Sequence, residues 1–164
     1  MGAIRKGLRR TFSRIMRLRP AKTVARVVLP PTERLIAAVS RGRLQLSSVL
    51  VPSLTLRTTG AKSGLPRETA LMCMPHGDGF VVVGSNFGDD HHPAWTANLL
   101  AHPEALVRYR GKVTRMSAEL VTGDERERLW SELEEMWPDY RAYERDSGRE
   151  LRIFRLSPAR HAGK

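Results

Sequence analysis

Between residues 49 and 156 the apolar positions fall into short runs that are separated by turn-forming residues. Gly60 and Gly64 lie in the first such turn, Gly77 and Gly79 in the second, and Gly111 in a later one. Short apolar runs bounded by glycine-containing turns are typical of antiparallel strands. The pattern predicts six strands, over residues 49–58, 68–74, 80–83, 107–109, 113–121 and 151–156.

Helical spacing is confined to a few segments of this region. Residues 94–101 predict a short helix, and residues 122–136 predict an amphipathic helix whose acid-rich first turn suits the helix dipole. A further short helical or irregular segment follows at 139–145. Six strands and few helices, without alternating βαβ units, predict a mainly β (α+β) fold, an antiparallel barrel with peripheral helices.

The first 43 residues have a different pattern. Residues 4–18 predict a basic amphipathic helix ending before Pro20, because apolar residues recur every three or four positions with arginine and lysine between them. A second helix is expected between Pro31 and Gly42. We therefore divide the chain into a basic helical segment, 1–43, which is membrane-associated or partly disordered, and a barrel domain, 44–164.

The net charge of +11 lies entirely in this first segment. Residues 1–43 contain 12 of the 28 lysines and arginines but one of the 17 acids, and the remainder has 16 of each. A neutral barrel argues against nucleic-acid binding. The basic helix instead suits an anionic membrane surface, and the alternatives are a disordered tail or a helix docked on a protein.

Few other classes fit the composition. No window of about 18 uncharged apolar residues indicates a membrane-spanning helix, and no signal peptide is recognisable. The single cysteine, Cys73, lies in an apolar run and is expected to be buried and inert, which fits a reducing cytoplasm.

His91 and His92 lack a metal-ligand spacing, so we expect no metal site. No nucleophilic triad or catalytic carboxylate pair is present.

The loop over residues 58–67 carries the most specific chemistry. It joins two predicted strands and contains two glycines, hydroxyl residues, Lys62 and Arg67. Glycines allow backbone N–H groups to converge, and the two cations donate charge-assisted hydrogen bonds, so the loop suits a phosphate or polycarboxylate. It is not a Walker loop, because the spacing differs. The alternative is a basic hairpin turn whose lysine is solvated.

Two motifs together resemble the deazaflavin-dependent nitroreductase family. The first is Thr58-Thr59-Gly60-x-Lys62-Ser63-Gly64-x-Pro66-Arg67, and the second is Pro93-Ala94-Trp95-x-x-Asn98-Leu99-x-Ala101-x-Pro103. The resemblance covers about residues 54–156. It implies a six-stranded, FMN-binding-like split β-barrel that binds coenzyme F420, a hydride donor with a phosphate and oligoglutamate tail.

The resemblance implies roles for particular residues. Lys62 and Arg67 would bind the anionic tail, and the backbone around Thr59, Gly60, Ser63 and Gly64 would add donors. Ala70, Leu71 and Met72 would run under the cofactor ring. Ser85 and Asn86 would line the edge of the ring. Trp95 would pack on the cofactor, while Asn98 would bind the phosphate arm or fix the preceding loop. Alternatively, Trp95 plugs the barrel end and Asn98 caps backbone groups.

An aromatic cluster near the C-terminus would form the acceptor pocket. Trp137, Tyr140 and Tyr143 are spaced by three, so a helical turn would align them. By resemblance they form a lid over the acceptor, and Tyr140 or Tyr143 orients or protonates it, with Ser85 also expected to contribute to catalysis. The alternative is an ordinary apolar stripe on the barrel.

This sequence departs from the family pattern at two cations. Ala61 occupies a position where the family usually has arginine, and Asn86 one where a basic residue is common. Arg57 could replace the missing charge, or the barrel could hold FMN. We expect a cytoplasmic reductase at the periphery of the membrane. It would pass hydride from reduced coenzyme F420 to a quinone or a nitroaromatic. It could also form a homodimer. A non-catalytic, membrane-peripheral ligand-binding protein is the remaining alternative.

Overall fold

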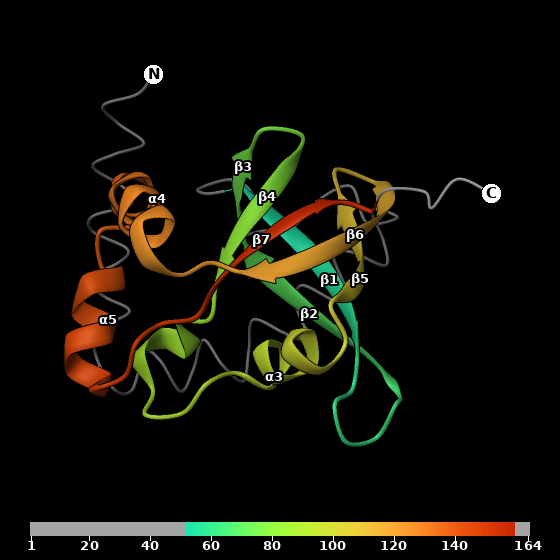
Figure 1. Ribbon diagram of the computed structural model, residues 1–164, viewed down its shortest axis with the longest axis horizontal. Coiled ribbons are helices and arrows are strands. Elements are labelled where there is room, and N and C mark those ends of the chain that lie inside the picture. The colour runs from blue at the N-terminus through green and yellow to red at the C-terminus, as the bar shows by residue number, and fades with distance from the viewer. Residues whose placement is uncertain (1–51, 160–164) are drawn as a thin grey trace.

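The computed structural model describes residues 52–159, which form one curled antiparallel sheet with helices around it (Figure 1). The strand order is β2-β1-β5-β6-β7-β4-β3. The strands are β1 (Ser53–Thr59), β2 (Pro66–Met72), β3 (Met74–His76), β4 (Gly79–Val83), β5 (Glu104–Tyr109), β6 (Lys112–Leu120) and β7 (Ile153–Pro158). The helical elements are the 3-10 turn η2 (Asn86–Gly88), α3 (Ala94–Ala101), α4 (Gly123–Met136) and α5 (Tyr140–Ser147).

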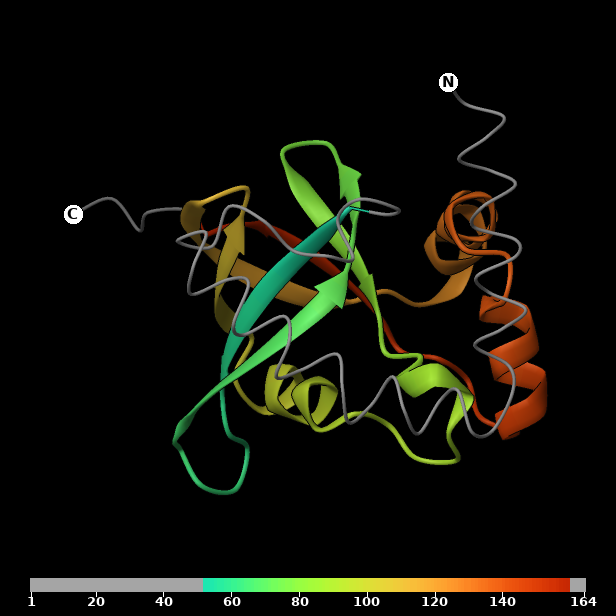
Figure 2. The ribbon, with the colours of Figure 1, turned by 180° about the vertical axis from the view of Figure 1, so that it is seen from behind.

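The sheet curls into a barrel because its two outermost strands are consecutive in the chain. Only Cys73 separates β2 from β3, although these strands stand at opposite ends of the strand order. The Cys73 N–H donates to the Pro52 carbonyl at 2.9 Å, and β2 also contacts β4. Figure 2 shows β1 and β2 crossing in front of β4 and β7 in this closed arrangement.

The predicted antiparallel barrel with peripheral helices is confirmed, but the predicted number of strands is wrong. Residues 68–74 were expected to form one strand, and the structure divides them at Cys73. The reason is a change of partner: β2 pairs with β1 as far as Met72, whereas β3 pairs with β4 from Met74 onward. The buried Cys73 marks that change, and burial raises the pKa of its thiol to about 12.

Two apolar clusters meet at the strands β4 and β7. Successive side chains of a strand point to opposite faces, so Val82 and Phe154 enter the barrel while Val81 and Ile153 face α4 and α5. Trp95 and Leu99 of α3 fill the barrel end. The barrel interior is therefore packed on one side of these strands, and the two C-terminal helices cover the other side.

The helices are close to their predicted positions. The helix expected at 94–101 is α3, that at 122–136 is α4, and the segment at 139–145 lies within the region of α5. No helix within residues 52–159 is long and apolar enough to cross a membrane. The basic segment 1–43, including the helices expected at 4–18 and after Pro31, lies outside the described residues.

Candidate active site

The loop between β1 and β2 is a compact turn that closes on its own backbone. The Gly60 N–H donates to the Leu65 carbonyl at 2.8 Å, and the Gly64 N–H donates to the Gly60 carbonyl at 2.8 Å. Gly64 has a φ of 65°, which favours glycine. A Cβ on Gly60 would stand 2.5 Å from Ser63 Oγ and 3.1 Å from the Leu65 carbonyl oxygen. Both glycines are thus required by the shape of the turn.

Asn98 holds this turn against the barrel. Its Oδ1 accepts a hydrogen bond from the Ala61 N–H at 2.9 Å, and its Nδ2 donates to Thr58 Oγ1 at 3.0 Å. Asn98 and Thr58 are both buried, so these bonds satisfy polar groups that water cannot reach. These contacts fit two of the roles suggested by the sequence, since Asn98 both fixes the β1–β2 loop and caps a backbone N–H group. Contact between Asn98 and a phosphate stays a prediction.

The two cations of the motif are exposed beside this turn. Lys62 lies in the turn, and Arg67 is on β2 opposite Thr58. Directly paired residues share one face of a sheet, so Arg67 lies on the face where Asn98 contacts Thr58. Arg57, which pairs with Glu68, must lie on the opposite face. The sequence left open that Arg57 replaces the arginine missing at position 61. Because Arg57 lies on the opposite face from Arg67, it does not take that place.

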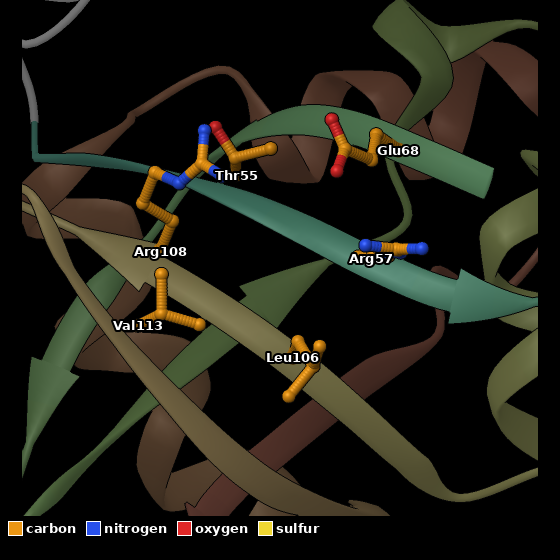
Figure 3. Close-up of a pocket in the computed structure, with 6 residues that line it drawn as sticks. All are labelled: Thr55, Arg57, Glu68, Leu106, Arg108 and Val113. Carbon is orange, nitrogen blue, oxygen red and sulfur yellow. The ribbon is translucent and has the colours of Figure 1, made fainter. Parts of the chain in front are cut away.

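Figure 3 shows the surroundings of Arg57 on that opposite face. Its guanidinium shares a pocket of about 70 Å³ with Glu68, Arg108 and neighbouring residues of β1, β5 and β6. Sites for ligands of cofactor size are usually roughly 300–1,000 Å³. This pocket is too small for a deazaflavin ring, and Glu68 would repel an anionic tail.

The three residues expected beneath the ring lie on β2, but their side chains diverge. Ala70 is exposed, Leu71 packs against the barrel interior and Met72 packs against the cluster beneath α4. They cannot all present side chains to one ring. What they share is the backbone of β2, which is an edge strand of the sheet within residues 52–159. An edge strand offers N–H and C=O groups to a ligand.

The loop after β4 carries Ser85 and Asn86 in an unusual conformation. Asn86, Phe87 and Gly88 have consecutive positive φ values of 47°, 54° and 75°. Left-handed backbone costs a non-glycine residue roughly 1–2 kcal/mol, so other contacts must hold the loop. The Asn86 amide provides some of them, because Nδ2 donates to the His91 carbonyl at 3.2 Å and to Asp89 Oδ2 at 3.4 Å.

His91 and His92 occupy different surroundings in this loop. His91 is exposed and its Nδ1 lies 3.0 Å from Asp90 Oδ1, and the hydrogen bond to His91 lowers the pKa of Asp90. His92 is half-buried beside Arg149, and the pKa of its imidazole is lowered by burial and then by Arg152 and Arg149. Within the described part of the chain, no cluster of three His, Cys, Asp or Glu side chains could hold a metal.

Trp95 is a buried side chain of the barrel end. It is 5% exposed, and its ring centroid lies 5.8 Å from that of Phe154. Trp95 and Asn98 are both on the buried face of α3, as their spacing predicted. The structure thus shows a packing role for Trp95, and its contact with a cofactor stays a prediction.

The aromatic residues near the C-terminus gather in one cluster but not on one helix. Trp137 ends α4, whereas Tyr140 and Tyr143 belong to α5. The expectation that one helical turn aligns all three is therefore wrong. Their packing is nonetheless shared: the rings of Tyr140 and Tyr143 are 6.5 Å apart, and all three side chains are at most 4% exposed.

Tyr140 is available as a hydrogen-bond donor and not as an anion. Burial raises the pKa of Tyr140, and the nearby Tyr143 and Cys73 raise it further, so its hydroxyl stays protonated. Tyr143 lies against η2, because a Cβ on Gly88 would stand 2.9 Å from Tyr143 Cδ1. Both tyrosine side chains are almost fully buried in this structure.

Arg149 is a residue that the sequence analysis missed. It follows Gly148, whose left-handed φ of 66° ends α5, and its guanidinium contacts the loop after β4. The only local signal was a glycine at a helix end. Nothing in the sequence indicates that this arginine reaches residues about 60 positions earlier.

The candidate site residues lie along an arc that runs from the β1–β2 turn, past α3, to η2 and α5. Figures 1 and 2 both show α3 between the β1–β2 turn and the pair formed by η2 and α5. The cationic turn is at one end of this arc, and the tyrosines are at the other.

Comparison with known proteins places the chain in a family. Residues 35–158 match the family described as F420H(2)-dependent quinone reductase. The chain belongs to this family. An F420H(2)-dependent quinone reductase of Mycobacterium tuberculosis is 38% identical over 81 residues, which cover 48% of this chain and 54% of that relative. The match therefore spans about half the length of that curated relative.

Longer matches come from one further relative and two solved structures. A putative F420H(2)-dependent quinone reductase of Mycobacterium tuberculosis is 26% identical over 66% of this chain and 91% of its own length. A solved F420-H2 dependent reductase is 34% identical, with a TM-score of 0.60 over 65% of this chain and 94% of that chain. A second structure, described as a domain-swapped dimer, is 30% identical with a TM-score of 0.62 over 77% and 99%. The split β-barrel expected from the family resemblance is confirmed.

Proposed function

We propose that this protein is an oxidoreductase that uses reduced coenzyme F420 to reduce a quinone. Membership of the quinone reductase family supports this proposal. The observation that carries it is the turn beside α3, where Lys62 and Arg67 flank a backbone turn that Asn98 fixes in place.

The residues of this chain fit the cofactor. An anionic tail needs exposed cations, and the turn supplies Lys62 and Arg67. The Gly60 and Gly64 N–H groups already donate to backbone carbonyls of the turn, so they hold its shape and do not add donors for the tail. The ring needs hydrogen-bonding partners along one side, and β2, an edge strand within residues 52–159, would supply backbone N–H and C=O groups beside Ala70. Coenzyme F420, when bound and reduced, supplies a hydride that the protein itself cannot provide.

The protein's own contribution is to bind, orient and donate a proton. Lys62 and Arg67 would hold the tail, while Ser85 and Asn86 would fix the ring edge. Reduction of a quinone consumes one hydride and one proton. We assign the proton to the hydroxyl of Tyr140 or Tyr143, and water would then replenish it. A nitroaromatic acceptor would use the same pocket as a side activity.

The alternatives left by the sequence are less well supported. FMN would also suit a split barrel, but the family that this chain matches is named for the deazaflavin. A non-catalytic ligand-binding protein would retain the cofactor without transferring hydride. An assay of reduced coenzyme F420 with menadione separates these cases, since turnover requires both the right cofactor and an accessible acceptor.

The proposal also includes a place in the cell and an assembly state. We propose a cytoplasmic protein that rests on the membrane through residues 4–18, because a membrane quinone is then within reach of the site. A homodimer is supported by the solved relative that is a domain-swapped dimer. Sedimentation of the full chain would test that assembly.

Binding of coenzyme F420 tests the function directly. Fluorescence titration should show saturable binding to the full chain, and Lys62→Ala should raise the Kd about 10-fold or more, because a hydrogen bond to a charged group contributes about 1.5–3 kcal/mol. Lys112→Ala is the matched control, since Lys112 is an exposed lysine at the start of β6. No saturable binding at concentrations of hundreds of micromolar would end the proposal.

A further inference from the structure

The loop from Gly84 to Asp89 has a conformation that its own hydrogen bonds, including the one from the Asn86 amide to Asp89, hold only in part. Three successive residues, Asn86, Phe87 and Gly88, have left-handed backbone, and Phe87 is a third exposed. The backbone hydrogen bonds at η2 are short-range: the Gly88 N–H donates to the Ser85 carbonyl at 2.9 Å, and the Asp89 N–H donates to the Asn86 carbonyl at 3.1 Å. A strained conformation persists only where surrounding contacts fix it.

One guanidinium supplies such contacts. Arg149 Nε donates to the Asp89 carbonyl at 2.8 Å, and Nη2 donates to the Ser85 carbonyl at 2.6 Å. Arg149 Nη1 lies 3.1 Å from both the Gly84 carbonyl oxygen and His92 Nδ1. Three carbonyls of one loop therefore converge on the planar fork of one side chain, a geometry that the single ammonium of lysine cannot reproduce.

The same contacts tie the loop to α5. Gly148 ends α5, so the position of Arg149 follows directly from that helix. On the other side of the loop, the backbone of Gly88 packs against the ring and Cα of Tyr143. Figure 2 shows η2 and α5 side by side. The loop and the helix that carries both candidate proton donors thus form one unit.

We infer that Arg149 is a positioning residue, which holds Ser85 and Asn86 in place for the ring of the cofactor and fixes that edge relative to Tyr140 and Tyr143. The inference rests on the proposed function, because it takes the loop as the ring edge of the coenzyme F420 site. It assigns Arg149 no contact with the tail, which Lys62 and Arg67 bind at the other end of the arc.

Because Arg149 is assigned to the ring and Lys62 and Arg67 to the tail, two probes can test these roles separately. Coenzyme F420 and the same deazaflavin ring without its phosphate–glutamate tail are titrated by fluorescence into the full chain and its variants. If Arg149→Met lowers the population of the observed loop conformation to about a tenth, the apparent Kd rises about 10-fold. The rise should be equal for the two probes, whereas Lys62→Ala should weaken only the probe with a tail.

Three controls separate positioning from general stability. Arg149→Lys keeps the charge and a long side chain, and it should weaken both probes nearly as much as Arg149→Met. Arg145→Met alters an exposed arginine of α5 that pairs with Asp146, and both Kd values should stay unchanged. Hydrogen exchange of the cofactor-free protein should accelerate at amides 85–89 in both Arg149 variants, with amides of β1 and β5 unaffected.

The outcomes are distinguishable. Wild-type Kd values in both Arg149 variants, or full rescue by lysine, would overturn the positioning role while the proposed function stands. Accelerated exchange throughout the barrel would overturn it as well, since Arg149 would then be a general stabilising residue. Failure of the wild-type chain to retain either probe would remove the proposed function and this inference together.

Discussion

Single side chains decide how the binding turn is held. Asn98 joins Ala61 and Thr58, which are 37 and 40 positions away in the chain. Its residue type was predicted to matter, since an amide can accept and donate at once. Its partners could not be predicted, because they depend on α3 docking against the end of β1.

Replacing Asn98 should damage both stability and binding. Asn98→Leu leaves the buried Thr58 hydroxyl and the Ala61 N–H without partners, so we expect a loss of about 1–3 kcal/mol in the free energy of unfolding. The coenzyme F420 Kd should also rise, because the turn is no longer fixed. Urea denaturation and fluorescence titration measure the two effects.

A second substitution provides the control for this prediction. Adding Thr58→Val removes one orphaned polar group, so stability should partly recover while the affinity does not. If Asn98→Leu leaves both stability and Kd unchanged, the turn does not depend on this amide.

His92 should make the stability of the protein depend on pH. Its pKa is lowered in the folded state by burial and by the nearby arginines, so the unfolded chain binds a proton more readily. The stability that the neutral imidazole contributes is fully present above the unfolded pKa of about 6.5, and it is lost progressively as the pH falls from that value to the lower pKa of the folded state. Thermal denaturation between pH 8 and pH 5 should show a shallower pH dependence for His92→Gln than for the wild type. Parallel curves would contradict this role.

At the scale of elements, the strands and helices were largely predictable and their pairing was not. Turn glycines and β-branched runs set the hairpins β1–β2 and β5–β6, and both formed as expected. The pattern does not predict the division of the strand at Cys73, because the residues on either side continue one apolar run. Whether a strand continues or changes partner depends on where its neighbours lie, which the local pattern does not contain.

The β3–β4 hairpin offers a test of close packing between elements. A Cβ on Gly79 would stand 1.9 Å from the Leu156 carbonyl oxygen of β7. Gly79→Ala should therefore disrupt the β4–β7 pairing and lower the free energy of unfolding by about 2–4 kcal/mol. Urea denaturation measures the loss.

Gly77 in the same turn is the matched control. Its φ of 58° is left-handed, but nothing lies within 4 Å of a Cβ placed there. Gly77→Ala should cost only about 1–2 kcal/mol from backbone strain. Equal losses for both variants would mean that the approach of β7 does not constrain Gly79.

At the scale of the whole molecule, charge divides the chain into two parts. The neutral barrel carries the candidate site, while the basic segment 1–43 carries the net charge of +11. We expect this segment to bring the site to an anionic membrane, where each nearby lysine or arginine contributes about 1 kcal/mol. That division rests on the sequence alone.

Charge reversal in the full chain tests this arrangement. Arg9→Glu with Arg10→Glu should weaken co-sedimentation with anionic liposomes at least about 10-fold, because two favourable charges become repulsive. Turnover of a water-soluble quinone such as menadione should stay unchanged. Equal binding of the variant and the wild type would show that residues 4–18 do not anchor the protein.

The sequence by itself determined the features that depend on neighbouring residues. The period of the apolar positions set the element types, the glycines of the first turn set its shape, and the paired motifs indicated the family. The tertiary structure alone decided which distant groups meet: Asn98 with the turn, Arg149 with three carbonyls, and Arg57 and Arg67 on opposite faces. These contacts follow from strand register and barrel closure, which bring residues together only when the entire sheet has formed.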